Sequence, residues 1–267
     1  MSIGNKYGTK WSEAETIMAY YYYCTRIPFS SIDMSNPEVI KLAELLGRTP
    51  GSVSLKLANL AHHDPDQKNR YISGMKNTSK LDKEIVERFY SNWEALSFTA
   101  SQIEIQMKNP ASSLTFAEDD NTYSEVVPPL GKEIEVQVKQ RVNQDFFRRA
   151  VLTTYSGRCC ITGLSEKRLL IASHIKPWRY SDPSTERTNP SNGLCLNALH
   201  DKAFDQGLIT VLPNYTIRVS SSLKSSEADD SATRFLLSYD KEKIILPNRF
   251  LPKKEFLEYH NDVIFIP

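Results

Sequence analysis

The sequence lacks a long hydrophobic run. No apolar segment approaches the roughly 18 residues that a helix needs to span a bilayer, and residues 1–10 lack the apolar segment of a secretion signal. We therefore expect a soluble, cytoplasmic protein with no membrane partner. The chain also has only four cysteines, which are too few and too irregularly spaced for a disulfide framework and are expected to be packed as free thiols.

Motifs of several other protein classes are absent as well. The chain contains no Gly-x-x-x-x-Gly-Lys-Ser/Thr phosphate loop, so ATP-driven translocation is not encoded here. It contains no Gly-x-Ser-x-Gly elbow for acyl transfer. Cys159 and Cys160 are adjacent and no Cys-x-x-Cys pair exists, so a structural zinc ion, which needs four well-placed ligands, is not expected.

The composition that remains is ordinary, but the charge is unevenly distributed. Hydrophobic residues make up 40% and charged residues 24% of the 267 residues, which favours two modest globular domains. Residues 109–131 hold four acids and no Lys or Arg, whereas residues 132–179 hold ten Lys and Arg against four acids. A polyanion-binding surface requires such an excess, although a solvated helix face would produce it too.

Residues 1–108 are predicted to form a helical domain. Trp11–Arg26 has no Gly or Pro, and Asn36-Pro37 starts a second helix that Gly47 ends before a third one follows. Two helices joined by a short glycine-containing turn match a helix-turn-helix, so we interpret the domain as helix-turn-helix or winged-helix-like. A plain helical hairpin is the alternative. A third helical stretch, Lys80–Met107, is expected to close the domain.

Residues 109–131 are interpreted as a linker because they combine prolines, small residues and acids without helical or strand periodicity. Residues 132–267 are then a second domain that mixes helices and strands, so the chain as a whole is predicted to be α+β. The elements expected there are a helix over Glu133–Tyr155, strands at Cys159–Thr162 and Leu169–His174, a helix over Leu194–Phe204, and a hairpin of Leu208–Leu212 with Thr216–Val219.

The aromatic residues near the N-terminus allow two interpretations. Trp11 and the run Tyr20-Tyr21-Tyr22-Tyr23 could line a pocket for an unusual base. An aromatic stripe on a helix more often belongs to the core, and we favour that interpretation.

An ordered set of short motifs in the second domain resembles the HNH endonucleases. Its members are Cys160-Ile161-Thr162-Gly163, Ala172-Ser173-His174-Ile175, Asn192-Gly193-Leu194-Cys195-Leu196, His200 and Phe204-Asp205-Gln206-Gly207. The resemblance extends from about Gln144 to the C-terminus. It implies a ββα-metal nuclease domain over 132–267, joined to a DNA-recognition domain over 1–108.

Within this resemblance, His174 and Asn192 are the expected catalytic residues. A histidine at the end of a strand, oriented by a backbone carbonyl, can take a proton from water near neutral pH, and His174 would be that general base. The resemblance gives Asn192 the task of fixing the loop between strand and helix through bonds to backbone. An ordinary helix N-cap is the compatible structural alternative.

The resemblance also implies a divalent cation, Mg²⁺ or Mn²⁺, that stabilises charge on the scissile phosphate and the departing 3′ oxygen. It points to His200 as one ligand, and we prefer Asp205 as the second. Ser173 stands where many relatives carry a ligand before the catalytic histidine, so the second ligand stays open. Asp201 and Asp205 are four residues apart, share a helical face and could both approach the ion.

The expected partner is double-stranded DNA, and the resemblance is to small bacterial restriction enzymes. It extends to nucleases that depend on a modified base, so a modified cytosine in the substrate is an open alternative, and we expect a homodimer. A non-catalytic DNA-binding regulator on the same scaffold is the competing function. Candidate DNA contacts are Arg48, Ser52, Lys56 and Asn59 in the first domain and Arg148, Arg149, Lys176 and Arg179 in the second.

Overall fold

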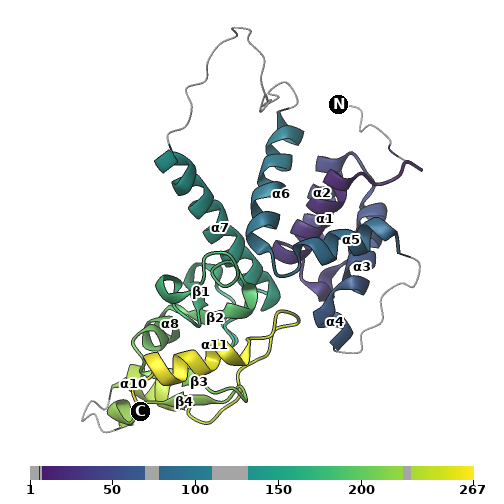
Figure 1. The fold of residues 1–267 in the computed structure, drawn as a ribbon. Helices are drawn as coiled ribbons and strands as arrows, with labels where there is room; N and C mark the ends of the chain where they lie inside the picture. The colour runs from purple at the N-terminus through teal and green to yellow at the C-terminus, as the bar shows by residue number, and fades with distance from the viewer. Residues whose placement is uncertain (1–5, 7, 70–77, 110–131, 225–229) are drawn as a thin grey trace.

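The computed structural model describes residues 6, 8–69, 78–109, 132–224 and 230–267. It is rich in helices and contains two small antiparallel sheets, so the α+β prediction is confirmed (Figure 1). Within these ranges no helix is both long and apolar enough to cross a membrane. The expected linker lies almost entirely outside the described residues, which stop at Asn109 and resume at Lys132.

The first half of the chain forms helices whose ends follow local capping signals. Ser12 and Glu15 form a capping box at the start of α1, and Asn36 caps α2 before Gly47 ends it in the left-handed region with a φ of 64°. The helical stretch expected over Lys80–Met107 is divided into two helices, because Ser91 adopts a φ of 74° and breaks it. The helices are α1 (Glu13–Thr25), α2 (Pro37–Leu46), α3 (Pro50–His63), α4 (Pro65–Asn69), α5 (Lys80–Phe89) and α6 (Trp93–Lys108).

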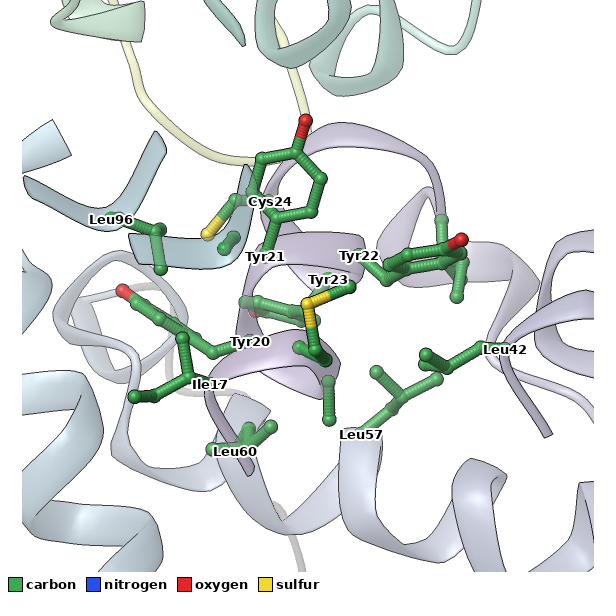
Figure 2. Close-up of a cluster of buried hydrophobic side chains, with 14 of the residues drawn as sticks. Ile17, Tyr20, Tyr21, Tyr22, Tyr23, Cys24, Leu42, Leu57, Leu60 and Leu96 are labelled. Carbon is green, nitrogen blue, oxygen red and sulfur yellow. The ribbon is translucent and has the colours of Figure 1, made fainter. Parts of the chain in front are cut away.

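The tyrosine run lies in the core of this half. Tyr20, Tyr21, Tyr22 and Tyr23 are each no more than 8% exposed and point to different sides of α1, where they meet neighbouring helices (Figure 2). Figure 2 also shows Leu42, Leu57 and Leu96, which come from α2, α3 and α6. The tyrosines therefore stabilise the domain and do not line a base-binding pocket.

The helices α2 and α3 are joined by the short turn Gly47–Thr49, as the sequence predicts. The part of this half that the structure describes contains helices and no strand, so a winged-helix β-wing is not seen there. The helix-turn-helix interpretation of the pair stays a prediction.

The second half is built around a ββα arrangement. Strand β1 (Leu170–His174) pairs antiparallel with β2 (Gly193–Asn197), so that His174 lies opposite Gly193. Helix α8 (Ala198–Asp205) follows directly and packs against both strands. The other elements are α7 (Lys132–Thr154), β3 (Ile209–Val211), β4 (Ile217–Val219), α9 (Ser221–Lys224), α10 (Ser231–Leu237) and α11 (Lys254–Tyr259).

Two expectations for this half are wrong. The helix expected from Leu194 begins as strand β2, because Leu194 and its neighbours pair with β1, and the helix starts only after its N-cap, Asn197. Cys159–Thr162 forms a turn rather than a strand, although Cys160 donates its N–H to the carbonyl of Cys195 over 2.7 Å. The hairpin of β3 and β4 is confirmed.

Helix α7 belongs to both halves of the molecule. Phe146 and Ala150 are part of the N-terminal core, whereas Phe147 and Val151 are part of the C-terminal core. In Figure 1, the upper end of α7 stands apart from α6, and its lower part lies beside the lower end of α6 and near β1 and β2. A single helix thus supplies side chains to two cores and fixes the position of one relative to the other.

Gly193 is needed where β2 approaches α7. A Cβ at this position would lie 3.0 Å from the Phe147 ring and still closer to Val151. The glycine therefore permits a backbone approach that brings α7 directly over the end of β1.

Candidate active site

His174 ends β1, and its tautomer follows from one hydrogen bond. The ring Nε2 lies 2.9 Å from the backbone carbonyl oxygen of Arg187. A carbonyl oxygen can only accept, so Nε2 carries the proton and donates it. In the neutral ring, Nδ1 is then left with a lone pair that can accept a proton from a bound molecule.

The ring of His174 is also held from two sides. Phe147 stacks on it with ring centroids 3.7 Å apart and an interplanar angle of 13°, and Trp178 meets it edge-on at 5.5 Å. Burial lowers the pKa of His174 to about 4, which the hydrogen bond to Arg187 only partly opposes. The imidazole is therefore neutral at pH 7, which is the form a proton acceptor requires.

Asn192 lies in the short helix η4 (Pro190–Asn192) and is fully buried. Its Oδ1 accepts the N–H of Lys176 over 2.8 Å, and its Nδ2 donates to the carbonyl of Lys176 and to Ser181 Oγ, each over 3.2 Å. These bonds join the two ends of the loop that follows His174. Asn192 is not a helix N-cap, since β2 follows it; the cap of α8 is Asn197.

His200 lies in the first turn of α8 and is 1% exposed. Its Nδ1 lies 3.1 Å from Asn197 Oδ1, and its ring meets Phe235 and Tyr239 edge-on. Its Nε2 is buried without a partner among the residues that the structure describes. Burial alone lowers the pKa of His200 to about 4, with no contribution from a carboxylate.

Asp201 and Asp205 lie on a different side of α8 from His200. Burial raises the pKa of both carboxyl groups, and the charge of Asp201 raises that of Asp205 further. The Ser173 hydroxyl is close enough to Asp201 to lower its pKa in part, although it makes no well-formed hydrogen bond. At 3.6 residues per turn, the five-residue spacing puts Asp205 about 140° around the helix from His200.

The structure thus places Asp205 with Asp201 rather than with His200. In the described ranges no group of three or more His, Cys, Asp or Glu side chains is arranged to hold a metal ion. The four cysteines are buried free thiols: Cys24 lies in the N-terminal core, and Cys159, Cys160 and Cys195 lie in the C-terminal core.

A cleft of about 260 Å³ opens beside His174. It is lined by Gln144, Phe147, Arg148, Ile171, Ala172, His174 and Trp178. Arg148 is exposed at this cleft and donates to the carbonyl of Leu170 over 3.1 Å.

The sequence does not predict the roles of Phe147, Trp178 and Arg187 around His174. Only Trp178, four residues after His174, could have been suspected from its position.

The placement of Arg48 and Lys56 on an exposed helix-turn-helix face is wrong. Arg48 is 7% exposed and pairs with Glu15 over 2.7 Å, and Lys56 is 5% exposed and pairs with Asp82 over 2.5 Å. Both cations also lie over the ring of Trp11, at 4.3 and 4.8 Å from its centroid. Their charges are paired inside the domain, although Arg48 also lines a cleft of about 830 Å³ together with Ser52, and a role as DNA contacts stays a prediction.

The other candidate DNA contacts differ in how exposed they are and in whether an acidic partner already pairs with them. Ser52 and Asn59 are half-buried on α3, and the Oδ1 of Asn59 is buried with no partner in the described structure. Arg149 pairs with Asp145 over 2.8 Å, and Lys176 pairs with Glu186 over 2.6 Å. Arg179 is exposed and stacks on the neighbouring Tyr180.

Comparison with known proteins identifies the ββα segment. Residues 159–212 match a family model described as HNH endonuclease. This stretch contains His174, Asn192, His200 and Asp205, the four residues that the sequence analysis assigned to catalysis and metal binding. No curated protein matches the chain.

Replacing Arg48 should damage stability rather than DNA recognition. In Arg48→Ala, the Glu15 carboxylate would lose its buried guanidinium and keep the exposed Lys6 over 2.7 Å, so the loss should stay below the cost of a fully broken buried pair, which is about 3 to 5 kcal/mol. Urea unfolding should show this loss, while exposed Lys41→Ala on α2 should unfold like the wild type. A stable Arg48→Ala protein with relaxed sequence preference would restore Arg48 as a DNA contact.

Proposed function

Because residues 159–212 are an HNH endonuclease domain, we propose that this protein hydrolyses phosphodiester bonds in double-stranded DNA, with His174 as the general base. The observation that carries the proposal is the fixed tautomer of His174. Its Nε2 donates to the carbonyl of Arg187, and its Nδ1 is left as an acceptor beside an open cleft. A water at Nδ1 would lose a proton to the ring as its oxygen attacks the phosphorus. The bond from phosphorus to the 3′ oxygen would then break.

We propose that Asn192 is a positioning residue for this step. It joins the backbone at Lys176 to the end of the loop that carries Arg187, and the carbonyl of Arg187 in turn orients His174. Loss of the Asn192 side chain would leave buried backbone groups unpaired and free the loop to move. The geometry of His174 would suffer although Asn192 never touches the phosphate.

A divalent cation would fit at the end of β1, on the side of the strand that faces α8. Consecutive strand residues point to opposite faces, so Ser173 is directed toward α8 where His174 is directed toward α7. The carboxylates of Asp201, which lies near Ser173, and of Asp205, which lies near Asp201, are oxygen donors of the kind that bind Mg²⁺ together with substrate phosphate and water. When bound, such an ion stabilises negative charge on the scissile phosphate and the leaving oxygen.

We therefore favour Asp201 with Asp205 as the protein ligands of Mg²⁺ or Mn²⁺. The helical spacing turns Asp205 about 140° around α8 from His200, which argues against a shared site for these two residues. His200 instead holds the first turn of α8 through Asn197 and two aromatic rings. The Nε2 of His200, which has no partner in the described structure, favours His200 as a metal ligand, as the sequence predicts. The metal-binding experiment below distinguishes His200 from the Asp201–Asp205 pair.

We further propose a role in restriction, because a helical domain without the HNH motifs precedes the nuclease domain. Dependence on a modified cytosine and action as a homodimer belong to this proposal as expectations from the resemblance. A non-catalytic DNA-binding regulator is the alternative function. The orientation of His174 favours the nuclease, since a regulator has no need of a fixed proton acceptor.

His174→Ala should abolish cleavage and leave DNA affinity nearly unchanged. General acid–base catalysis contributes a factor of about 10² to 10⁴ to the rate. The imidazole would meet only the phosphate that is cut, so its loss should change DNA affinity little. Cleavage of unmodified and cytosine-modified duplex DNA would be followed in the presence of Mg²⁺. Binding of the same duplexes would be measured in EDTA, where no cleavage occurs. His62→Ala is the matched control, since His62 lies at the end of α3 in the other half of the chain from His174. Cleavage by His174→Ala at the wild-type rate would remove the general base from this account.

If Asp201 and Asp205 hold the metal ion, variants of these two residues should lose metal binding, whereas a variant of His200 should keep it. Asp201→Asn and Asp205→Asn should each raise the Mn²⁺ concentration for half-maximal cleavage at least tenfold and weaken Mn²⁺ binding measured directly by calorimetry. His200→Gln should leave Mn²⁺ binding unchanged while lowering thermal stability. Asp262→Asn, at an exposed carboxylate near the C-terminus, is the control. Loss of Mn²⁺ binding in His200→Gln alone would return the metal to His200.

A further inference from the structure

A second and larger cleft lies where the two halves of the chain meet. Its volume is about 610 Å³. One wall comes from the end of α1 and from α2, and the other comes from α7 and the segment that enters β1. The lining residues are Thr25, Arg26, Pro28, Glu38, Arg148, Arg149, Leu152, Thr153, Ser156, Gly157, Lys167 and Leu170. We call it the interdomain cleft.

The interdomain cleft carries an excess of positive charge. Four of its lining residues are Lys or Arg, and Glu38 is the one acidic residue among them. Arg148 and Lys167 have no ion-pair partner among the described residues. Arg26 stacks on Tyr22 and reaches Glu38 and Glu104 only at 4.0 and 3.9 Å, the outer limit of an ion pair. Arg148 and Lys167 are therefore available to an anion that enters the cleft, and Arg26 would have to exchange its two long ion pairs for a contact with that anion.

The interdomain cleft continues from the cleft beside His174. Arg148 lines both, and the consecutive residues Leu170 and Ile171 of β1 line one each. His174 lies four positions after Leu170 in the strand, which is about 13 Å at 3.3 Å per residue. Duplex DNA carries one phosphate per strand every 3.4 Å of its axis, so a strand cut at His174 would place further phosphates within this distance.

One direct bond joins the two walls of the interdomain cleft, and further bonds join the two halves of the chain outside it. Thr153 on α7 donates its hydroxyl to the carbonyl of Thr25 over 2.7 Å. Ser97 on α6 donates to the carbonyl of Val142 over 3.2 Å, and buried Arg249 donates to the carbonyls of Tyr23 and Ile27. A site held open by such contacts loses little conformational freedom on binding.

We propose that the interdomain cleft binds the sugar–phosphate backbone of the DNA duplex beside the phosphate that is cut, and that Arg26 is a phosphate contact contributed by the N-terminal half. The proposal rests on the proposed function and extends it by placing the DNA across both halves. It also gives the N-terminal half a phosphate contact outside the α2–α3 segment. There the two candidate cations, Arg48 and Lys56, are committed to buried ion pairs.

The test is the salt dependence of binding, measured without cleavage. Fluorescence anisotropy of a labelled 25-base-pair duplex in EDTA would compare wild type with Arg26→Gln and Lys167→Ala between 50 and 200 mM salt. Each lost phosphate contact should lower the slope of log affinity against log salt by about 1, and should weaken binding at 0.1 M salt roughly fivefold to tenfold. Lys167 is exposed and makes no ion pair in the described structure, so its variant tests the proposal even if Arg26→Gln is poorly folded.

Arg168→Ala is the matched control. Arg168 adjoins Lys167 in the chain but pairs with Glu166 over 2.9 Å and does not line the cleft, so its variant should bind like the wild type. Single-turnover cleavage at saturating DNA should also be unchanged in Arg168→Ala, since Arg168 lies outside the cleft. Wild-type affinity and salt slope in both cleft variants would overturn the proposal, even if the protein cleaves DNA. If the wild type binds duplex in EDTA but cleaves none, the proposed function fails while the cleft assignment is still decided by the slopes.

Discussion

The close packing of α7 on the β1–β2 pair is the contact on which the rest of the structure depends. Because Gly193 has no side chain, α7 can approach β2 closely enough for Phe147 to lie flat against His174. The same helix places Phe146 and Ala150 in the core of the other half. The histidine orientation and the relative position of the two halves therefore have one common cause. A side chain at position 193 would disturb both.

This arrangement changes how the two halves divide their work. The cations of the α2–α3 segment are neutralised around Trp11 and stabilise the N-terminal half. Positive charge without an ion-pair partner in the described structure lies instead at the junction, where Arg148 and Lys167 line one cleft together with Arg26. Residues 248–250 strengthen the junction, since Asn248 accepts a bond from Gln67 and the N–H of Phe250 donates to Asp66. A duplex held at this junction would contact both halves at once, so recognition and cutting would be coupled by position.

Much of this could be predicted from the sequence, and the failures have physical causes. The caps at Asn36 and Gly47 and the motif around His174 depend on local chemistry and are placed correctly. Leu194–Leu196 was misjudged because an apolar run has the same appearance in a strand and a helix, and only pairing with β1 decides between them. Arg48 and Lys56 were misjudged because their partners, Glu15 and Asp82, lie 33 and 26 residues away. The stacking of Phe147 on His174 depends likewise on a contact across 27 positions of sequence, which no local pattern reports.

Catalysis with His174 as the base requires that the protein itself, before any metal or DNA binds, holds His174 as a neutral ring with its proton on Nε2. A long-range proton–nitrogen NMR spectrum of the histidine rings at pH 7, in EDTA, reports this state directly. The His174 signals would be identified by their loss in His174→Ala. We predict the pattern of a neutral imidazole protonated on Nε2 and bonded to the carbonyl of Arg187. A proton on Nδ1, or a doubly protonated ring, would leave no acceptor at the cleft and would contradict the assignment of His174 as the base.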